Sequence, residues 1–423
     1  MSVKVDHFQA YEILDSRGRP TVMAKCFLAD GAIGKASVPS GASTGKAEAV
    51  ELRDGDPSRY NGLGCIKAVQ NINSVINDAV SGLAFATQEE FDEKLIRLDG
   101  SENKSHLGAN SILACSLAFA KAYAINQKQP LYQYFGSLLG VNTYRSPRLT
   151  VNLFSGGKHA GGQIPIQDLL IVPMSAQTID QALADVHKVY YSAAKLIQKK
   201  YGMRTLTADE GGLAPNFISI DDLFLDAIES IILAGFEPGK DIALAVDVAS
   251  SHFYENGTYQ MDDKHLSGDQ QIALLEKWVT NYPIVSMEDG LAEEDWANWP
   301  NLNQLIGSKV LVLGDDLLCT QTKRIDKAIE SKAANALLLK VNQCGTLSEA
   351  LAAYKLAKSA GWQVTISARS GETEDDWLAD LAVGWSGDQI KVGSITQSER
   401  LAKYNRLIEI SRDNPTIQMK SWN

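Results

Sequence analysis

Four short apolar runs in the second half of the chain each lead into a charged residue. Asp247 follows IALAV, Glu288 closes PIVSME, Asp315 follows VLVLG, and Lys340 follows ALLL. Short apolar runs are typical of the buried strands of a parallel sheet. In an α/β barrel, the carboxyl ends of such strands open on the active-site face. We therefore expect three carboxylates and one amine to converge on one site.

These residue types predict a metal ion beside a general base. Carboxylates gathered around one point repel one another unless a cation neutralises them, and an all-oxygen set suits a hard ion such as Mg²⁺. Asp247, Glu288 and Asp315 therefore predict a magnesium site. Burial and a nearby divalent cation would lower the pKa of Lys340, so that its neutral amine could accept a proton. Any one of these charges could merely end a strand at the surface, but four at matching positions favour a shared site.

Composition excludes several classes of protein. The chain has 423 residues and a formal net charge of −11, which argues against a dedicated surface for nucleic acid or anionic membrane. Its five cysteines form no Cys-x-x-Cys pair, so we expect reduced thiols and a cytoplasmic location. No apolar run reaches the roughly 18 residues that a membrane span needs, and no targeting segment is recognised at the amino terminus.

The order of expected elements indicates two domains. Alternating residues between 3 and 38 predict antiparallel strands, and later segments have helical periodicity, at 64–81, 88–98 and 109–126. From about residue 151, short apolar runs alternate with helices, which predicts a parallel barrel or an open doubly wound sheet. The sequence contains no Gly-x-Gly-x-x-Gly turn, which argues against the most common kind of nucleotide-binding open sheet. We expect a TIM-type α/β barrel at 139–423, preceded by a smaller α+β capping domain at 1–138.

Motifs along the whole chain resemble those of the enolase (phosphopyruvate hydratase) family. The matching segments are PSGASTG (39–45), ELRDGD (51–56), LGANSIL (107–113), DEGG (209–212), SMEDGL (286–291), LGDDL (313–317), RSGETED (369–375) and QIKVGS (389–394). The resemblance implies a glycolytic, Mg²⁺-dependent lyase that dehydrates 2-phosphoglycerate to phosphoenolpyruvate. It also implies two Mg²⁺ ions per site, the second arriving with substrate, a homodimer or dimer-based oligomer, and a barrel whose first strands depart from simple β/α alternation.

The same resemblance assigns catalytic roles. It implies that Asp247, Glu288 and Asp315 bind the high-affinity Mg²⁺, and that Lys340 removes the proton from C2 of the substrate. Glu210, in the DEGG segment, would protonate the departing hydroxyl. An acid beside glycines could instead simply cap a helix, so the role of Glu210 follows from the resemblance alone.

Further residues would bind the substrate. Lys391 would face the substrate carboxylate together with both metal ions, and Gln167 would also bind the substrate. Arg369 and Ser370 would hold the phosphate, which suits the planar, bidentate guanidinium.

Two loops are expected to close over the substrate. Ser40, in the PSGASTG segment, would help bind the second Mg²⁺ when its loop closes, although small polar residues also favour a plain flexible linker. His159 would lie on another closing loop, where flanking glycines let the backbone approach a ligand.

The chain departs from the family pattern inside the expected site. Asp168, a catalytic candidate, stands where the family has a glutamate. Its side chain is one methylene shorter, so its carboxylate lies closer to the backbone. Ala368 replaces the family's histidine before Arg-Ser-Gly-Glu-Thr, which removes an imidazole. Arg19 and Ser155 each replace a family asparagine.

These departures leave three interpretations open. The first is an enolase, the second is a paralogue that acts on a phosphonate or carboxyphosphono analogue of phosphoenolpyruvate, and the third is a non-catalytic binding protein that kept the fold. Space at Ala368 beside the phosphate-binding Arg369 motivates the second interpretation, whereas the retained base, acid and metal ligands argue against the third.

Overall fold

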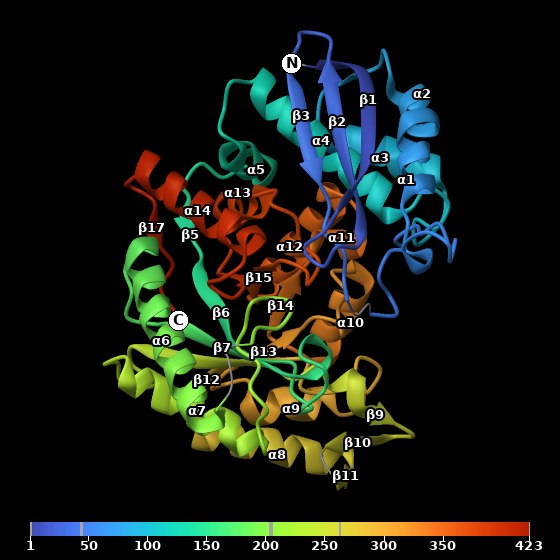
Figure 1. The fold of residues 1–423 in the computed structure, drawn as a ribbon. Helices are drawn as coiled ribbons and strands as arrows, with labels where there is room; N and C mark the ends of the chain where they lie inside the picture. Colours follow the sequence, from blue (N-terminus) through green and yellow to red (C-terminus); the bar gives the residue numbers. More distant parts are fainter. Residues whose placement is uncertain (1, 43–44, 203–205, 262–263, 423) are drawn as a thin grey trace.

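The computed structural model describes residues 2–42, 45–202, 206–261 and 264–422. Within them, an amino-terminal sheet covered by helices precedes a closed barrel of eight strands (Figure 1). The closed barrel confirms the expected TIM-type fold and excludes an open doubly wound sheet. No helix among the described residues is long and apolar enough to cross a membrane.

The amino-terminal sheet is antiparallel, as its alternating sequence predicts. Its strands are β1 (Val3–Leu14), β2 (Pro20–Leu28), β3 (Ile33–Ser37) and the short β4 (Ala84–Phe85), in the order β3-β2-β1-β4. The turn between β1 and β2 is held by Asp15, whose Oδ1 accepts hydrogen bonds from the backbone N–H groups of Arg17 and Arg19.

The predicted helices are present in this region. The segment expected at 64–81 is a run of α1 (Ile66–Asn71), a π-helical stretch (Ile72–Ile76) and α2 (Asn77–Val80), preceded by a 3₁₀ turn (Tyr60–Gly62). The Thr87 hydroxyl accepts a hydrogen bond from the backbone N–H of Glu90 and so caps α3 (Gln88–Asp99). Helix α4 (Ala109–Asn126) packs against β2 and β3, and α5 (Leu131–Leu139) follows it.

The barrel begins with an antiparallel hairpin and continues with parallel strands. Its strands are β6 (Arg148–Ser155), β7 (Asp168–Pro173), β8 (Ile242–Asp247), β12 (Ile284–Glu288), β13 (Leu311–Gly314), β14 (Ala336–Leu339), β15 (Gln363–Ser367) and β16 (Gln389–Gly393). Strand β7 is antiparallel to both β6 and β8, while every other neighbouring pair is parallel. The first strands therefore depart from simple β/α alternation, as the resemblance implies.

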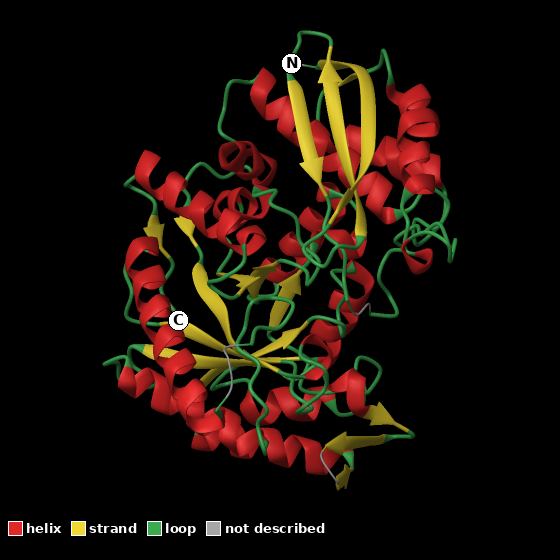
Figure 2. Cartoon of the chain, viewed as in Figure 1, coloured by secondary structure: helices red, strands yellow, loops and turns green. Residues whose placement is uncertain are grey.

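Helices surround the barrel (Figure 2). They are α6 (Ile179–Tyr201), α7 (Ile220–Leu233), α8 (Gly268–Asn281), α9 (Trp299–Ile306), α10 (Thr322–Ser331), α11 (Val341–Cys344), α12 (Leu347–Ser359), α13 (Trp377–Gly384) and α14 (Ser398–Asp413). Short elements complete the fold: 3₁₀ turns at Gly157–His159 and Ser250–Phe253, a small sheet of β9 (Tyr254–Glu255), β10 (Thr258–Met261) and β11 (Lys264–Leu266), and the pair β5 (Arg145–Ser146) and β17 (Gln418–Met419).

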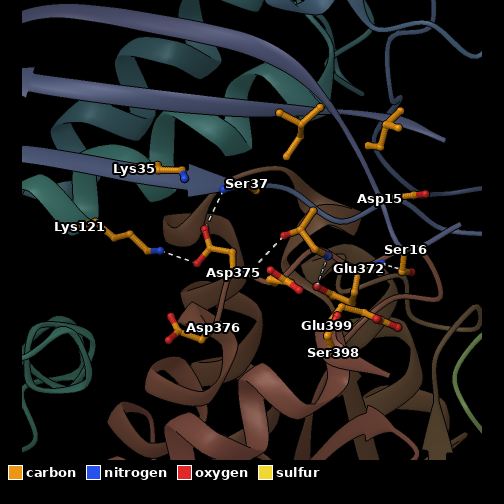
Figure 3. Close-up of a pocket in the computed structure, with 14 residues that line it drawn as sticks. Asp15, Ser16, Lys35, Ser37, Lys121, Glu372, Asp375, Asp376, Ser398 and Glu399 are labelled. Atoms are coloured by element: carbon orange, nitrogen blue, oxygen red, sulfur yellow. Dashed lines mark hydrogen bonds and ion pairs between the residues drawn. The ribbon is translucent and has the colours of Figure 1, made fainter. Parts of the chain in front are cut away.

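The amino-terminal region packs directly on the barrel. Helix α5 packs against α13, and Ser40 and Gly371 exchange two backbone hydrogen bonds. Asp375 accepts a hydrogen bond from the backbone of Ser37 and pairs with Lys121 of α4 (Figure 3). These contacts fix the loop that follows β3 beside the loop that follows β15.

Candidate active site

The predicted charges do converge at one end of the barrel. Asp247 and Glu288 end the neighbouring strands β8 and β12 and are paired in register. Asp315 and Lys340 directly follow β13 and β14, the next two strands around the barrel. Lys391, on β16, donates to Asp247 at 2.9 Å and to Glu288 at 2.6 Å. All five residues are buried or nearly so.

The acids fit a hard divalent cation. The Lys391 ammonium already bridges Asp247 and Glu288, which shows that a positive charge fits between them. Burial and then repulsion from Asp247 raise the pKa of Glu288 well above its usual range. The Oε1 atom of Glu288 is buried with no hydrogen-bond partner among the described residues. An unpartnered oxygen in an all-carboxylate set suits Mg²⁺.

Lys340 forms an ion pair with one of the acids of the site. Its ammonium pairs with the Asp315 carboxylate, whose other oxygen accepts from Gln343 at 2.8 Å. Burial lowers the pKa of Lys340, but attraction to Asp315 outweighs burial, so the pKa lies above its usual value. The predicted lowering of this pKa presupposes a divalent cation beside Lys340, so it stays a prediction for the metal-bound site.

Asp315 also belongs to a tighter acidic group. Ligand atoms of Asp289, Asp315 and Asp316 lie within 4.8 Å of one another. The Asp289 carboxylate accepts hydrogen bonds from the backbone N–H groups of Asp315 and Asp316, at 3.0 and 2.8 Å. Asp289 has a φ of 43°, an uncommon value outside glycine that clusters at functional sites. Asp289 and Asp316 are not among the site residues predicted from sequence, although each directly follows a predicted metal ligand.

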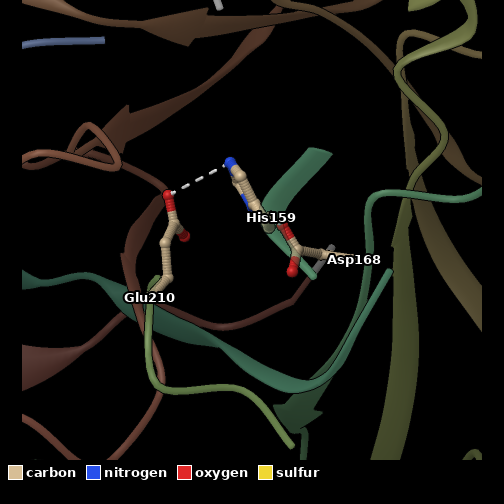
Figure 4. Close-up of side chains that lie close together, drawn as sticks. All are labelled: His159, Asp168 and Glu210. Carbon is tan, nitrogen blue, oxygen red and sulfur yellow. Dashed lines mark hydrogen bonds and ion pairs between the residues drawn. The ribbon is translucent and has the colours of Figure 1, made fainter. Parts of the chain in front are cut away.

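His159, Asp168 and Glu210 form a second group of ligand-type side chains (Figure 4). The Nδ1 of His159 lies 3.0 Å from Oδ2 of Asp168, and its Nε2 lies 4.0 Å from Oε1 of Glu210. Burial lowers the pKa of His159, but the Asp168 and Glu210 carboxylates outweigh burial and raise it to about 9. His159 is therefore an imidazolium at neutral pH.

Glu210 is held as an anion in this arrangement. Its Oε2 accepts a hydrogen bond from Asn152 at 3.1 Å. Burial raises the pKa of Glu210, but the positive charges of His159, Arg400 and Lys391 outweigh burial and lower it below the usual value. Glu210 can therefore deliver a proton only after it receives one from a neighbour such as His159.

Arg369 and Ser370, the expected phosphate-binding residues, line the same pocket as Lys340 and Glu210. Arg369 is buried and donates to both carboxylate oxygens of Glu48, at 2.9 and 3.3 Å. The hydroxyl oxygen of Ser370 accepts a hydrogen bond from Arg17 at 3.2 Å. Gln167 donates to Asp247 at 3.3 Å. Arg17 and Glu48 were missed from sequence because they lie far along the chain from Arg369 and Ser370.

Three of the expected site residues do not line the pocket, namely Asp168, Glu288 and Ser40. The Ser40 hydroxyl is engaged by Glu51 at 3.0 Å and by Arg53 at 2.7 Å, whereas Ala42 in the same loop does line the pocket. Ser43 and Thr44 of the PSGASTG segment lie outside the described residues.

One departure from the family pattern, Ala368, lines the pocket beside Arg369. His252, which sequence reasoning missed, lines the same pocket. Burial and then Lys158 lower the pKa of His252 to about 4, so it is neutral. The sequence could have indicated His252, because it lies five residues after Asp247, in the segment that follows strand β8.

The fold and site define a barrel enzyme with a carboxylate cluster, a buried amine and an anion-binding arginine at the carboxyl ends of its strands. Comparison with known families agrees: residues 5–135 match the model described as "Enolase, N-terminal domain", and residues 143–416 match "Enolase, C-terminal TIM barrel domain". Enolase 1 of Methylococcus capsulatus is 46% identical over 418 residues, which cover 98% of each chain. The chain belongs to the enolase family and is an enzyme of the phosphopyruvate hydratase type.

Proposed function

We propose that this enzyme dehydrates 2-phosphoglycerate to phosphoenolpyruvate, as in glycolysis, with Mg²⁺ as cofactor. The observation that carries the proposal is one pocket lined by a candidate base, a candidate acid and a candidate phosphate ligand, namely Lys340, Glu210 and Arg369. A non-catalytic protein would have no need to keep these three groups around one pocket.

Three carboxylates and a loop would hold the metal ions. Asp247, Glu288 and Asp315 are the proposed ligands of the first Mg²⁺, and Ser40 belongs to the loop proposed for the second. When bound, Mg²⁺ supplies positive charge that stabilises the anion formed by removing a proton next to a carboxylate. Ser40 has its hydroxyl engaged by Glu51 and Arg53, so its part in binding requires the loop to rearrange.

Proton transfer is divided between two sides of the pocket. Lys340 would take the C2 proton once its amine is neutral, which requires that Asp315 no longer stabilise the ammonium. Glu210 would protonate the C3 hydroxyl as it leaves. The cationic His159, whose Nε2 lies 4.0 Å from Glu210, is suited to supply that proton, with Asp168 holding its Nδ1.

Fixed donors would orient the substrate. Arg369 and Ser370 would bind the phosphate, because a guanidinium can donate two parallel hydrogen bonds to phosphate oxygens. Lys391 would neutralise the substrate carboxylate, and Gln167, whose buried Oε1 has no hydrogen-bond partner among the described residues, would contribute a polar contact.

A second candidate function follows from Ala368. A small side chain lines the pocket beside Arg369 where the family resemblance implies an imidazole, so a phosphonate or carboxyphosphono analogue of phosphoenolpyruvate is the alternative substrate. A steady-state assay decides between the two functions: purified protein is given 2-phosphoglycerate, and phosphoenolpyruvate is followed by ultraviolet absorbance with Mg²⁺ and after chelation. We expect Mg²⁺-dependent turnover, and its absence in folded protein would favour the alternative substrate.

We also propose a cytoplasmic homodimer or dimer-based oligomer. Family membership supports it, and β1 carries the exposed apolar side chains of Tyr11 and Leu14. Leu14 lines a cavity of about 610 Å³ between the amino-terminal sheet and the barrel (Figure 3). Light scattering coupled to size exclusion would give twice the 45.9 kDa chain mass for a dimer, and a monomer mass would contradict this assembly.

A further inference from the structure

Ser155 and Asp168 face each other across the first hairpin of the barrel. Ser155 ends β6, Asp168 begins β7, and the two residues are paired in register. The Ser155 hydroxyl donates to Oδ1 of Asp168 at 2.5 Å, and both side chains are fully buried. In this environment no solvent competes for the bond, so the carboxylate is held in one orientation.

That orientation determines where the second oxygen of Asp168 points. With Oδ1 occupied by Ser155, Oδ2 faces Nδ1 of His159 at 3.0 Å. An imidazole held at Nδ1 by a carboxylate keeps a fixed ring direction, and here its Nε2 points toward Glu210 at 4.0 Å (Figure 4). The chain of contacts therefore runs from Ser155 through Asp168 and His159 to Glu210.

Ser155 is also tightly packed against the loop that carries Glu210. The backbone N–H of Ser155 donates to the carbonyl of Leu213 at 2.9 Å. A Cβ added at Gly212 would lie only 2.4 Å from the Ser155 hydroxyl oxygen. The loop therefore encloses Ser155 without space for a side chain at 212, and the hydroxyl cannot easily turn away from Asp168.

The Ser155 hydroxyl lies directly across the strand pair from Asp168 and holds its carboxylate in place. We propose that Ser155 is a positioning residue for the Asp168–His159 pair. The catalytic consequence rests on the proposed dehydration, in which this pair acts on the hydroxyl-loss side.

A double-mutant cycle tests the coupling of Ser155 to Asp168. The variants are Ser155→Ala, Asp168→Asn and the combined variant, assayed for turnover and for exchange of the C2 proton with solvent. We expect each single change to lower kcat about tenfold or more and the combined variant to lose little beyond the larger single loss, because contacting residues are not additive. Losses that simply multiply in the combined variant would overturn the coupling.

Truncation of the hydroxyl tests the positioning role. Ser155→Ala should lower kcat about tenfold, while KM and the rate of C2 exchange stay within about twofold of the parent values. The reason is that only departure of the C3 hydroxyl from the substrate depends on this side of the pocket. The matched control is Ser230→Ala, which removes an equally buried hydroxyl that donates to a backbone carbonyl within α7. Equal losses of turnover and C2 exchange in Ser155→Ala would contradict a positioning role.

A measurement without substrate separates this inference from the proposed function. In protein labelled with ¹⁵N-histidine, the His159 ring signals are assigned by their loss in His159→Gln. Ser155→Ala should shift the Nδ1 signal of His159, whereas Ser230→Ala should not. An unmoved signal overturns the inference even if the enzyme dehydrates 2-phosphoglycerate, and a shifted signal upholds the contact chain even if it acts on another substrate.

Discussion

Glu48 and Arg369 form a buried, two-pronged ion pair between the amino-terminal region and the barrel. Both oxygens of Glu48 accept hydrogen bonds from the guanidinium of Arg369, at 2.9 and 3.3 Å. The two residues are 321 positions apart in sequence. Glu48 therefore engages both terminal nitrogens of the guanidinium, in the bidentate geometry that also suits phosphate oxygens. The pair also couples the loop after β3 to the phosphate end of the proposed site.

Glu48→Gln should destabilise the protein, because it leaves the buried Arg369 charge without its anion. Breaking a buried pair by removing one partner costs about 3 kcal/mol or more. Guanidinium denaturation followed by fluorescence measures the loss, and Glu330→Gln, an exposed glutamate on α10, is the control with a change within about 0.5 kcal/mol. Equal midpoints for the two variants would show that the pair contributes nothing to stability.

Lys340→Ala should abolish exchange of the C2 proton while Mg²⁺ binding stays nearly intact, because it deletes the base and none of the proposed metal ligands. Exchange is measured by loss of deuterium from C2-labelled substrate, and metal binding by calorimetry. Lys309→Ala, at an exposed lysine, should leave both unchanged. Exchange that persists in Lys340→Ala would assign the base to another group.

Asp315→Asn should weaken Mg²⁺ binding at least about tenfold, since the carboxamide keeps the shape but removes one of three attracting charges. Activity at fixed metal concentration should fall and recover partly at high Mg²⁺. Calorimetric titration with Mg²⁺ gives the affinity directly. The control is Asp326→Asn, at an exposed acid on α10. Equal Mg²⁺ affinity in the two variants would show that Asp315 is not a metal ligand.

His159 should make stability depend on pH in the alkaline range. Burial lowers the pKa of His159, but the carboxylates of Asp168 and Glu210 outweigh burial and raise the pKa from 6.5 to about 9. A raised pKa contributes stability that is fully present below about pH 6.5 and is lost as pH rises through about 9. The melting temperature of His159→Gln should therefore lie below that of the parent at pH 6, and the gap should narrow by pH 10. His187→Gln, at an exposed histidine, should show no such narrowing.

Ala368→His distinguishes the two candidate substrates. If 2-phosphoglycerate is the substrate, the restored imidazole should raise kcat/KM on it about threefold or more, and Ala368→Asn, which adds bulk without an imidazole, should not. If the space at Ala368 holds part of a larger substrate, both variants should lose activity on that substrate through a steric clash. A melting transition like that of the parent confirms that each variant is folded.

Convergence of the charged strand ends could be predicted from sequence because it follows from local pattern. Asp247, Glu288, Asp315 and Lys340 each follow a short apolar run, and the carboxyl ends of parallel strands meet at one end of a barrel. The antiparallel first sheet and the Thr87 helix cap could also be predicted from sequence, since side-chain alternation and capping involve residues only a few positions apart.

Partnerships between distant segments were decided by the tertiary structure alone. Glu48 meets Arg369 only because the amino-terminal region packs on the barrel, and Ser155 meets Asp168 only because β6 and β7 pair in one register. The partner of Lys340 had the same origin: its ammonium pairs with Asp315, which directly follows the neighbouring strand β13. Residue types and spacing thus determined which chemistry the site can hold. Packing and register determined which pairs of groups face each other, because electrostatic and hydrogen-bond energies depend on distances that sequence does not contain.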